Sequence, residues 1–134
     1  MDGATRTLVR ERAIRRCEYC HIPDRALALP FHVEHIVASV HRLDDSPSNL
    51  AWACPRCNLR KGPSLSTIDP LTGNDIDLFN PRTMEWQIHF AIREGRVFGL
   101  TAEGRGTALL LDMNNEKRVQ HRQKLIEHGT FEIY

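Results

Sequence analysis

Two short cysteine motifs decide the fold of this chain: Cys17-Glu18-Tyr19-Cys20 and Cys54-Pro55-Arg56-Cys57. Two residues separate the cysteines of each motif, so both thiolates can bind one metal ion from a single tight turn. Two such motifs complete a tetrahedral four-thiolate site that leaves no coordination position open. We therefore predict a structural Zn²⁺ site, which would hold together the residues between the motifs. Its ligands are Cys17, Cys20, Cys54 and Cys57.

Length and composition favour a small protein of the cytoplasm. The chain has 134 residues, which is typical of one domain with a modest core. All four cysteines belong to the two motifs, so none is left for a disulfide. The first residues lack the apolar core of a signal peptide, and no apolar run reaches the length of a membrane span. We expect no membrane association.

The charge of the chain is unevenly distributed. Residues 1–62 carry ten Lys and Arg against seven Asp and Glu, whereas residues 63–134 carry eight against ten. The first half is therefore +3 and the second −2, in agreement with the overall +1. Basic residues beside the two cysteine motifs are suited to phosphate contacts, although a solvated helix face is an equal alternative on charge alone. Those predicted to contact DNA are Arg15, Arg16, Arg56, Arg60 and Lys61.

Hydrophobic periodicity and turn residues predict a mixed α+β chain. In the first half we expect a helix over 5–16, a strand over 27–34, a strand over 50–53 and a short helix from 58 to 61. In the second half we expect a loop over 62–82, a strand over 86–91 that turns at 94–95 into a hairpin with 97–100, and helices over 102–113 and 115–127. We interpret residues 1–62 as a core and 63–134 as an extension packed on it within one structural domain.

The residues between and after the cysteine motifs resemble the signature of the HNH endonucleases, the zinc-containing branch of the ββα-metal or His-Me finger nucleases. The resemblance rests on Glu34-His35-Ile36, on Asn49-Leu50 and on Cys54-Pro55-Arg56-Cys57-Asn58-Leu59-Arg60-Lys61-Gly62, in this order. It covers about residues 5–62. It implies a ββα-metal core with the zinc site as scaffold, a C-terminal β-hairpin and helices beyond it, and hydrolysis of DNA.

The resemblance also implies roles for individual residues. His35 would be the general base that activates water, because imidazole titrates near neutral pH. Glu34 and Asn58 would offer oxygen ligands to a catalytic Mg²⁺ or Mn²⁺. Asn49 would hold the loop that presents His35. Most relatives have Asp in place of Glu34, so the longer side chain would place the metal differently or bind it through a water.

Two points are left open by the sequence. Strict alternation along a strand sends Glu34 and His35 to opposite faces, so the strand must end or bend there if both serve one site. The function also has alternatives: a zinc-dependent nucleic-acid-binding module that has lost catalysis, or a nuclease that acts mainly on RNA. We expect a monomer or a weak homodimer, because one such site cuts one strand.

Overall fold

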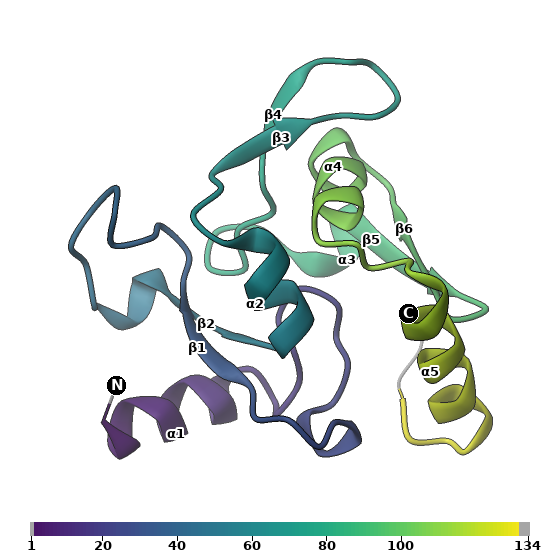
Figure 1. Cartoon of the computed structure of the whole chain (residues 1–134), viewed down its shortest axis with the longest axis horizontal. Helices are drawn as coiled ribbons and strands as arrows, with labels where there is room; N and C mark the ends of the chain where they lie inside the picture. Colours follow the sequence, from purple (N-terminus) through teal and green to yellow (C-terminus); the bar gives the residue numbers. More distant parts are fainter. Residues whose placement is uncertain (1, 132–134) are drawn as a thin grey trace. The chain divides into compact units, whose positions relative to one another are not determined.

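The structure is a computed structural model that describes residues 2–131, and its chain divides into two compact units (Figure 1). Unit 1 comprises Met1–Leu65 and Asn80–Thr83, and unit 2 comprises Ser66–Phe79 and Met84–Tyr134. Both units contain helices and short strands, so the predicted α+β class is confirmed. No helix in the described part of the chain has the length and apolar character needed to cross a membrane.

Unit 1 contains an antiparallel hairpin followed by a helix, the predicted ββα order. β1 (His32–His35) pairs with β2 (Leu50–Ala53), in a register that places Glu34 opposite Ala51. α2 (Pro55–Lys61) follows β2 directly and ends at Gly62, whose φ is positive. The connections of unit 1 contain two short 3₁₀ turns, η1 (Asp24–Ala26) and η2 (Pro47–Asn49).

α1 (Gly3–Arg12) packs against β2 partly through arginine side chains. The Arg6 guanidinium carbon lies 4.6 Å from the centroid of the Trp52 ring. Arg10 Nε donates to Asp24 Oδ2 at 2.6 Å, and the same oxygen accepts from the Trp52 indole N–H at 3.2 Å. Part of the arginine-rich start of the chain therefore stabilises the hairpin.

The first helix is shorter than the expected 5–16. It spans 3–12 because Ile14 and Arg15 both adopt positive φ, of 57° and 56°, which ends the helix and turns the chain. Ile14, which helical spacing places on the apolar face, is 72 % exposed. This prediction was wrong at the C-terminal end, because the turn that leads to Cys17 takes the place of the last helical turn.

The first strand is also shorter than the expected 27–34. Residues 27–31, which follow η1, form an irregular segment, and pairing begins only at His32. Leu29 is 67 % exposed while Phe31 is buried, so the two do not share the expected face. Pro30 has no N–H to donate to a neighbouring strand. The second strand, by contrast, has the predicted bounds of 50–53.

The described residues of unit 2, which end at 131, form two antiparallel hairpins and three helices. β3 (Ser66–Ile68) pairs with β4 (Asp75–Asp77), and β5 (Phe90–Arg93) pairs with β6 (Arg96–Gly99). The predicted turn at 94–95 is confirmed, as are the two C-terminal helices, which are α4 (Ala102–Leu110) and α5 (Glu116–Glu127). α4 packs closely on both hairpins. A Cβ at Gly104 would lie 2.1 Å from the His89 carbonyl oxygen, and one at Gly106 would lie 2.6 Å from Ile76 Cδ1.

Two predictions for unit 2 were wrong. The expected loop over 62–82 contains β3 and β4, whose three-residue strands are too short to show clear alternation. The expected strand over 86–91 begins as α3 (Trp86–His89). Trp86 and Phe90 are buried with ring centroids 5.1 Å apart, whereas Ile88 between them is 57 % exposed. Apolar residues four positions apart fit a helical turn as well as an alternating strand.

Asp69 stabilises the turn between β3 and β4 although its side chain is fully buried. Arg105 donates to it from Nε and from Nη2, each at 2.9 Å. The Thr72 hydroxyl and the Leu71 N–H donate two further hydrogen bonds. These donors, the Arg105 guanidinium first, hold the pKa of Asp69 far below its usual value. The ionised carboxylate thus joins the hairpin to α4.

We expect Asp69→Asn to lower the thermal unfolding temperature of the protein at neutral pH and to reduce its sensitivity to acid. A depressed folded-state pKa stabilises the fold above the unfolded-state pKa, about 3.9 for Asp, and this contribution is lost as the pH falls below that value. Circular dichroism melts across the acid range measure the effect. Asp75→Asn, an exposed residue of the same hairpin, is the control. Equal acid sensitivity of Asp69→Asn and the unmodified protein would contradict the assignment.

Candidate functional site

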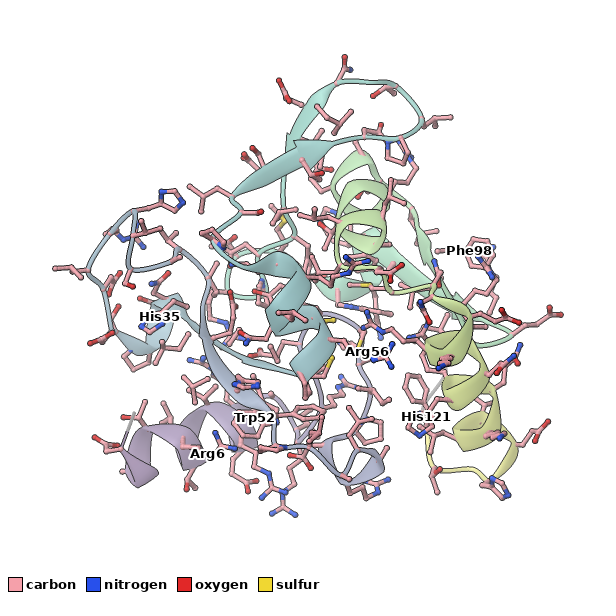
Figure 2. All side chains as sticks on the ribbon, in the orientation of Figure 1. Arg6, His35, Trp52, Arg56, Phe98 and His121 are labelled. Carbon is pink, nitrogen blue, oxygen red and sulfur yellow. The ribbon has the colours of Figure 1, made fainter. Side chains whose placement is uncertain are left out.

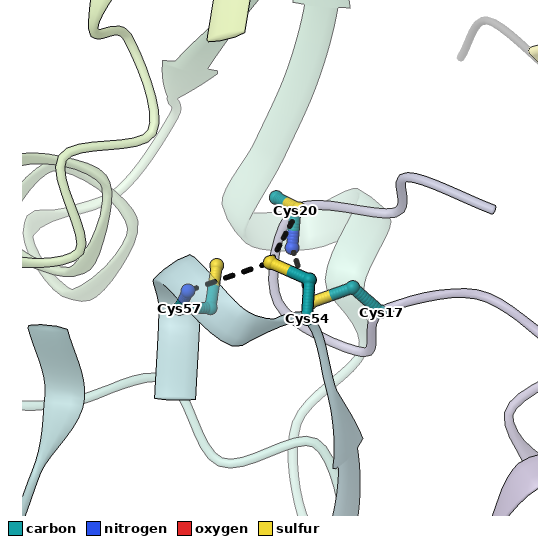
Figure 3. A group of neighbouring side chains, drawn as sticks. All are labelled: Cys17, Cys20, Cys54 and Cys57. Carbon is teal, nitrogen blue, oxygen red and sulfur yellow. Dashed lines mark hydrogen bonds between the residues drawn. The ribbon is translucent and has the colours of Figure 1, made fainter. Parts of the chain in front are cut away.

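The four cysteines form one buried cluster in unit 1, as the sequence predicts (Figure 3). Their sulfur atoms all lie within 4.8 Å of one another, and none is part of a disulfide. The Sγ atoms of Cys20 and Cys54 are 3.8 Å apart. A tetrahedral Zn²⁺ with metal–sulfur bonds of about 2.3 Å requires sulfur–sulfur distances of about 3.8 Å. The cluster therefore fits a closed zinc site.

Backbone hydrogen bonds give each cysteine motif the turn that a shared ion requires. Cys20 N–H donates to Cys17 Sγ at 3.5 Å, and Cys57 N–H donates to Cys54 Sγ at 3.4 Å. The second of these bonds also caps the N-terminus of α2. Such N–H donors stabilise thiolate sulfur. Burial raises the pKa of the Cys17 and Cys57 thiols, so a bound cation is needed to keep them ionised.

Glu18 attaches the first cysteine motif to the end of β2. Its N–H donates to the Trp52 carbonyl at 2.8 Å, and its Oε2 accepts from the Trp52 N–H at 2.8 Å. Its other carboxylate oxygen pairs with the Arg82 guanidinium. Because β2 continues into Cys54, these contacts bring the two motifs together across the intervening sequence.

His35 lies at the end of β1 with its side chain 27 % exposed (Figure 2). Its Nε2 is 2.7 Å from Asp45 Oδ1. An ionised carboxylate only accepts hydrogen bonds, so this contact assigns the proton to Nε2 and leaves Nδ1 as the basic nitrogen. A partly exposed imidazole in this tautomer has the form that a general base requires.

The Asn49 side chain folds the loop after His35 back onto β2. Its Oδ1 accepts from the Val37 N–H at 2.9 Å, and its Nδ2 donates to the carbonyls of Val37 and Asp44. The contact with Asp44 fixes the chain next to Asp45, which in turn contacts the His35 ring. The side chain is 2 % exposed, so Asn49 acts on the loop and not on a ligand.

Glu34 is buried on the inner side of β1, away from the environment of His35. Its Oε2 accepts from the Tyr19 hydroxyl at 2.7 Å, and its Oε1 lies 2.5 Å from the Lys61 ammonium. Burial raises the pKa of the Glu34 carboxyl, and Lys61 and Tyr19 oppose that rise. Asn58, the other predicted ligand, is a partly exposed residue of α2.

The residues predicted to contact DNA fall into two groups. Arg15, Arg56 and Arg60 are exposed, and Arg16 is partly exposed. Lys61 is only 2 % exposed and interacts with Glu34 and with carbonyls of β1, so its ammonium is not accessible to phosphate. Arg15 also pairs with Glu11 at 3.0 Å on the surface, an interaction that solvent weakens.

Asp45 and Tyr19 were missed as site residues in the sequence. Asp45 lies in the loop that Asn49 folds back, and an acidic residue within ten positions of a candidate base is too common a feature to single it out. Tyr19 lies inside the first cysteine motif, where metal ligation is the dominant signal. Its contact with Glu34 depends on how the motif packs on β1.

Comparison with known families agrees with this geometry. A family model described as HNH endonuclease matches residues 17–64, a range that includes both cysteine motifs, β1, β2 and α2. The matched residues all belong to unit 1. No curated protein and no solved structure matches the chain.

Proposed function

We propose that the protein, whose residues 17–64 match the HNH endonuclease family model, is an endonuclease that hydrolyses phosphodiester bonds of DNA. The observation that carries the proposal is the arrangement of His35. Its ring is partly exposed at a strand end, with Nε2 against Asp45 and Nδ1 left to accept a proton. A binding module has no need of an imidazole held in one tautomer.

In the proposed reaction His35 Nδ1 takes a proton from a water molecule, and the resulting hydroxide attacks the phosphorus atom. The bond from phosphorus to the 3′ oxygen breaks, that oxygen takes a proton from solvent water, and His35 releases its proton to solvent afterwards. The products carry a 5′-phosphate and a 3′-hydroxyl, as the family resemblance implies. Asp45 stabilises the imidazolium form of His35 through the hydrogen bond at Nε2.

The exposed arginines of unit 1 are the proposed contacts for the DNA backbone. Arg56 and Arg60 lie on α2, and Arg15 and Arg16 precede the first cysteine motif. Residues 1–62 carry a net charge of +3, so the attraction to phosphate is modest. We expect affinity to fall steeply as salt is added, because each phosphate contact releases counterions.

The proposed cofactors are a structural Zn²⁺ at the four cysteines and a divalent cation, Mg²⁺ or Mn²⁺, for the reaction. When bound, such a cation would neutralise charge on the phosphate. Of the two side chains that the sequence predicts as its ligands, Asn58 remains accessible and Glu34 is engaged inside the fold.

Incubation with supercoiled plasmid tests this function. We expect nicked circles to appear with Mn²⁺ or Mg²⁺ and not with EDTA, and a monomer to produce them before linear DNA. The same assay on single-stranded RNA distinguishes an RNA nuclease. If the zinc-loaded protein retards DNA in a gel but cuts neither polymer, the alternative of an inactive binding module is correct.

A further inference from the structure

Three buried polar side chains meet between the first cysteine motif, β1 and α2: Tyr19, Glu34 and Lys61. We propose that Glu34 and Lys61 form a positioning ion pair that fixes the backbone of His35, and that Glu34 is not a ligand of the catalytic cation. This inference rests on the proposed nuclease function. The family resemblance, by contrast, implies that Glu34 is an oxygen ligand of the catalytic cation.

The ion pair is enclosed on both sides. Glu34 is 5 % exposed and Lys61 is 2 % exposed, and the Glu34 Oε1 atom lies 2.5 Å from Lys61 Nζ. The Tyr19 hydroxyl, from a residue that is fully buried, donates to the second oxygen at 2.7 Å. One carboxylate oxygen thus accepts a hydrogen bond from Tyr19, and the other is in ionic contact with Lys61 but has no hydrogen-bond partner. The charge of each partner is compensated, as buried ions require.

Lys61 connects this pair to the backbone of the proposed general base. Its ammonium donates to the Ile36 carbonyl at 2.8 Å and contacts the His35 carbonyl at 3.3 Å. These two carbonyls and the Glu34 carboxylate are three oxygen contacts of the ammonium. The two carbonyls belong to the last residue of β1 and to the residue after it, so Lys61 fixes the peptide planes on both sides of Ile36.

The alternation of β1 explains how Glu34 acts on His35 without sharing its surroundings. The Glu34 side chain points into unit 1, whereas the His35 side chain is partly exposed and contacts Asp45. Lys61 thus contacts the backbone at the end of β1 from the interior of unit 1. Asp45 contacts the imidazole ring from the loop. Glu34 is needed because a buried ammonium without a counter-ion is strongly unfavourable.

The same geometry argues against direct ligation by Glu34. Mg²⁺ retains several water ligands in proteins, and a carboxylate that is 5 % exposed leaves little room for them. A divalent cation bound to Glu34 would also lie close to the Lys61 ammonium, and like charges repel strongly inside a protein. The ammonium already supplies the positive charge that the carboxylate needs.

A double-mutant cycle on zinc-loaded protein tests the pair, with Glu34→Gln, Lys61→Met and the double variant. We expect each single variant to lower the unfolding temperature, because it leaves one buried charge without its partner. The double variant should lose less than the sum of the two single losses, since both charges are then absent. The matched control is the exposed pair of Glu11 and Arg15, whose cycle should show little coupling. Additive losses at Glu34 and Lys61 would overturn the proposal, as would a double variant that fails to fold.

Metal titration and cleavage then distinguish a positioning residue from a ligand. We expect the double variant to bind Mn²⁺ as the intact protein does in calorimetry, because neither side chain is a ligand. Its plasmid cleavage should be no faster than that of Lys61→Met, because both variants lack the ammonium that fixes the two carbonyls. If Glu34 is a ligand, Glu34→Gln and the double variant both lose affinity for Mn²⁺. An intact protein that cuts no nucleic acid would instead contradict the proposed function, and the unfolding cycle would still test the ion pair.

Discussion

Replacing Cys57 with serine is expected to leave unit 1 unfolded or aggregated, with no zinc bound to the chain. Cys57 supplies one of the four sulfur atoms of the buried cluster. A serine hydroxyl is a poor zinc ligand beside three thiolates. The variant therefore loses the ion and much of the link between the two cysteine motifs.

The size of this effect follows from the free energy of zinc binding. Structural zinc sites contribute about 10–16 kcal/mol of apparent binding free energy at neutral pH, whereas whole domains are stable by about 5–15 kcal/mol. Unit 1 has only short strands and short helices around the cluster, so its apolar core is small. Loss of the ion thus exceeds what the rest of the unit can compensate.

Elemental analysis and circular dichroism of the purified protein measure this outcome. Leu59→Ser is the matched control, because Leu59 lies on the same helix and is 79 % exposed. It should retain one zinc ion per chain and the unmodified spectrum. A Cys57→Ser variant that folds normally without zinc would mean that the cysteines are only a compact core, and the zinc assignment would then be wrong.

The parts of the fold that the sequence predicts best are those set by short-range chemistry. The spacing of the cysteines predicts their cluster, and the apolar run at 50–53 predicts β2. The Glu94-Gly95 dipeptide predicts the turn of the β5–β6 hairpin. In the structure both residues adopt positive φ at that turn. In each case the residues that determine the structure are neighbours in the chain.

The errors arise where partners distant in the sequence decide the outcome. Asp69 is a turn residue in the sequence, but Arg105 of α4 makes it the buried anchor of an unexpected hairpin. The burial of Glu34 also depends on distant partners, Tyr19 of the first cysteine motif and Lys61 of α2. A charged residue is normally assigned to the surface, so the burial of Lys61 could be recognised only from its contacts in the folded chain.

Replacing His35 with alanine is expected to reduce plasmid cleavage by about 10²–10⁴-fold, the contribution typical of a general base. The fold, the zinc content and the affinity for DNA should remain, because the His35 side chain lies at a strand end and is not part of the cysteine cluster. His32→Ala is the matched control, since His32 is an exposed histidine of the same strand. Its cleavage rate should stay close to that of the unmodified protein.

Two further variants separate the base from the cation in this scheme. Asp45→Asn should lower the rate less than His35→Ala does, because it weakens the hydrogen bond that orients the imidazole and leaves the base in place. Asn58→Ala should weaken Mn²⁺ binding, so that high Mn²⁺ restores part of its activity. Single-turnover cleavage rates and calorimetric Mn²⁺ titrations provide the readouts. If His35→Ala abolishes Mn²⁺ binding while Asn58→Ala leaves it intact, His35 is a metal ligand and the general base must be another group.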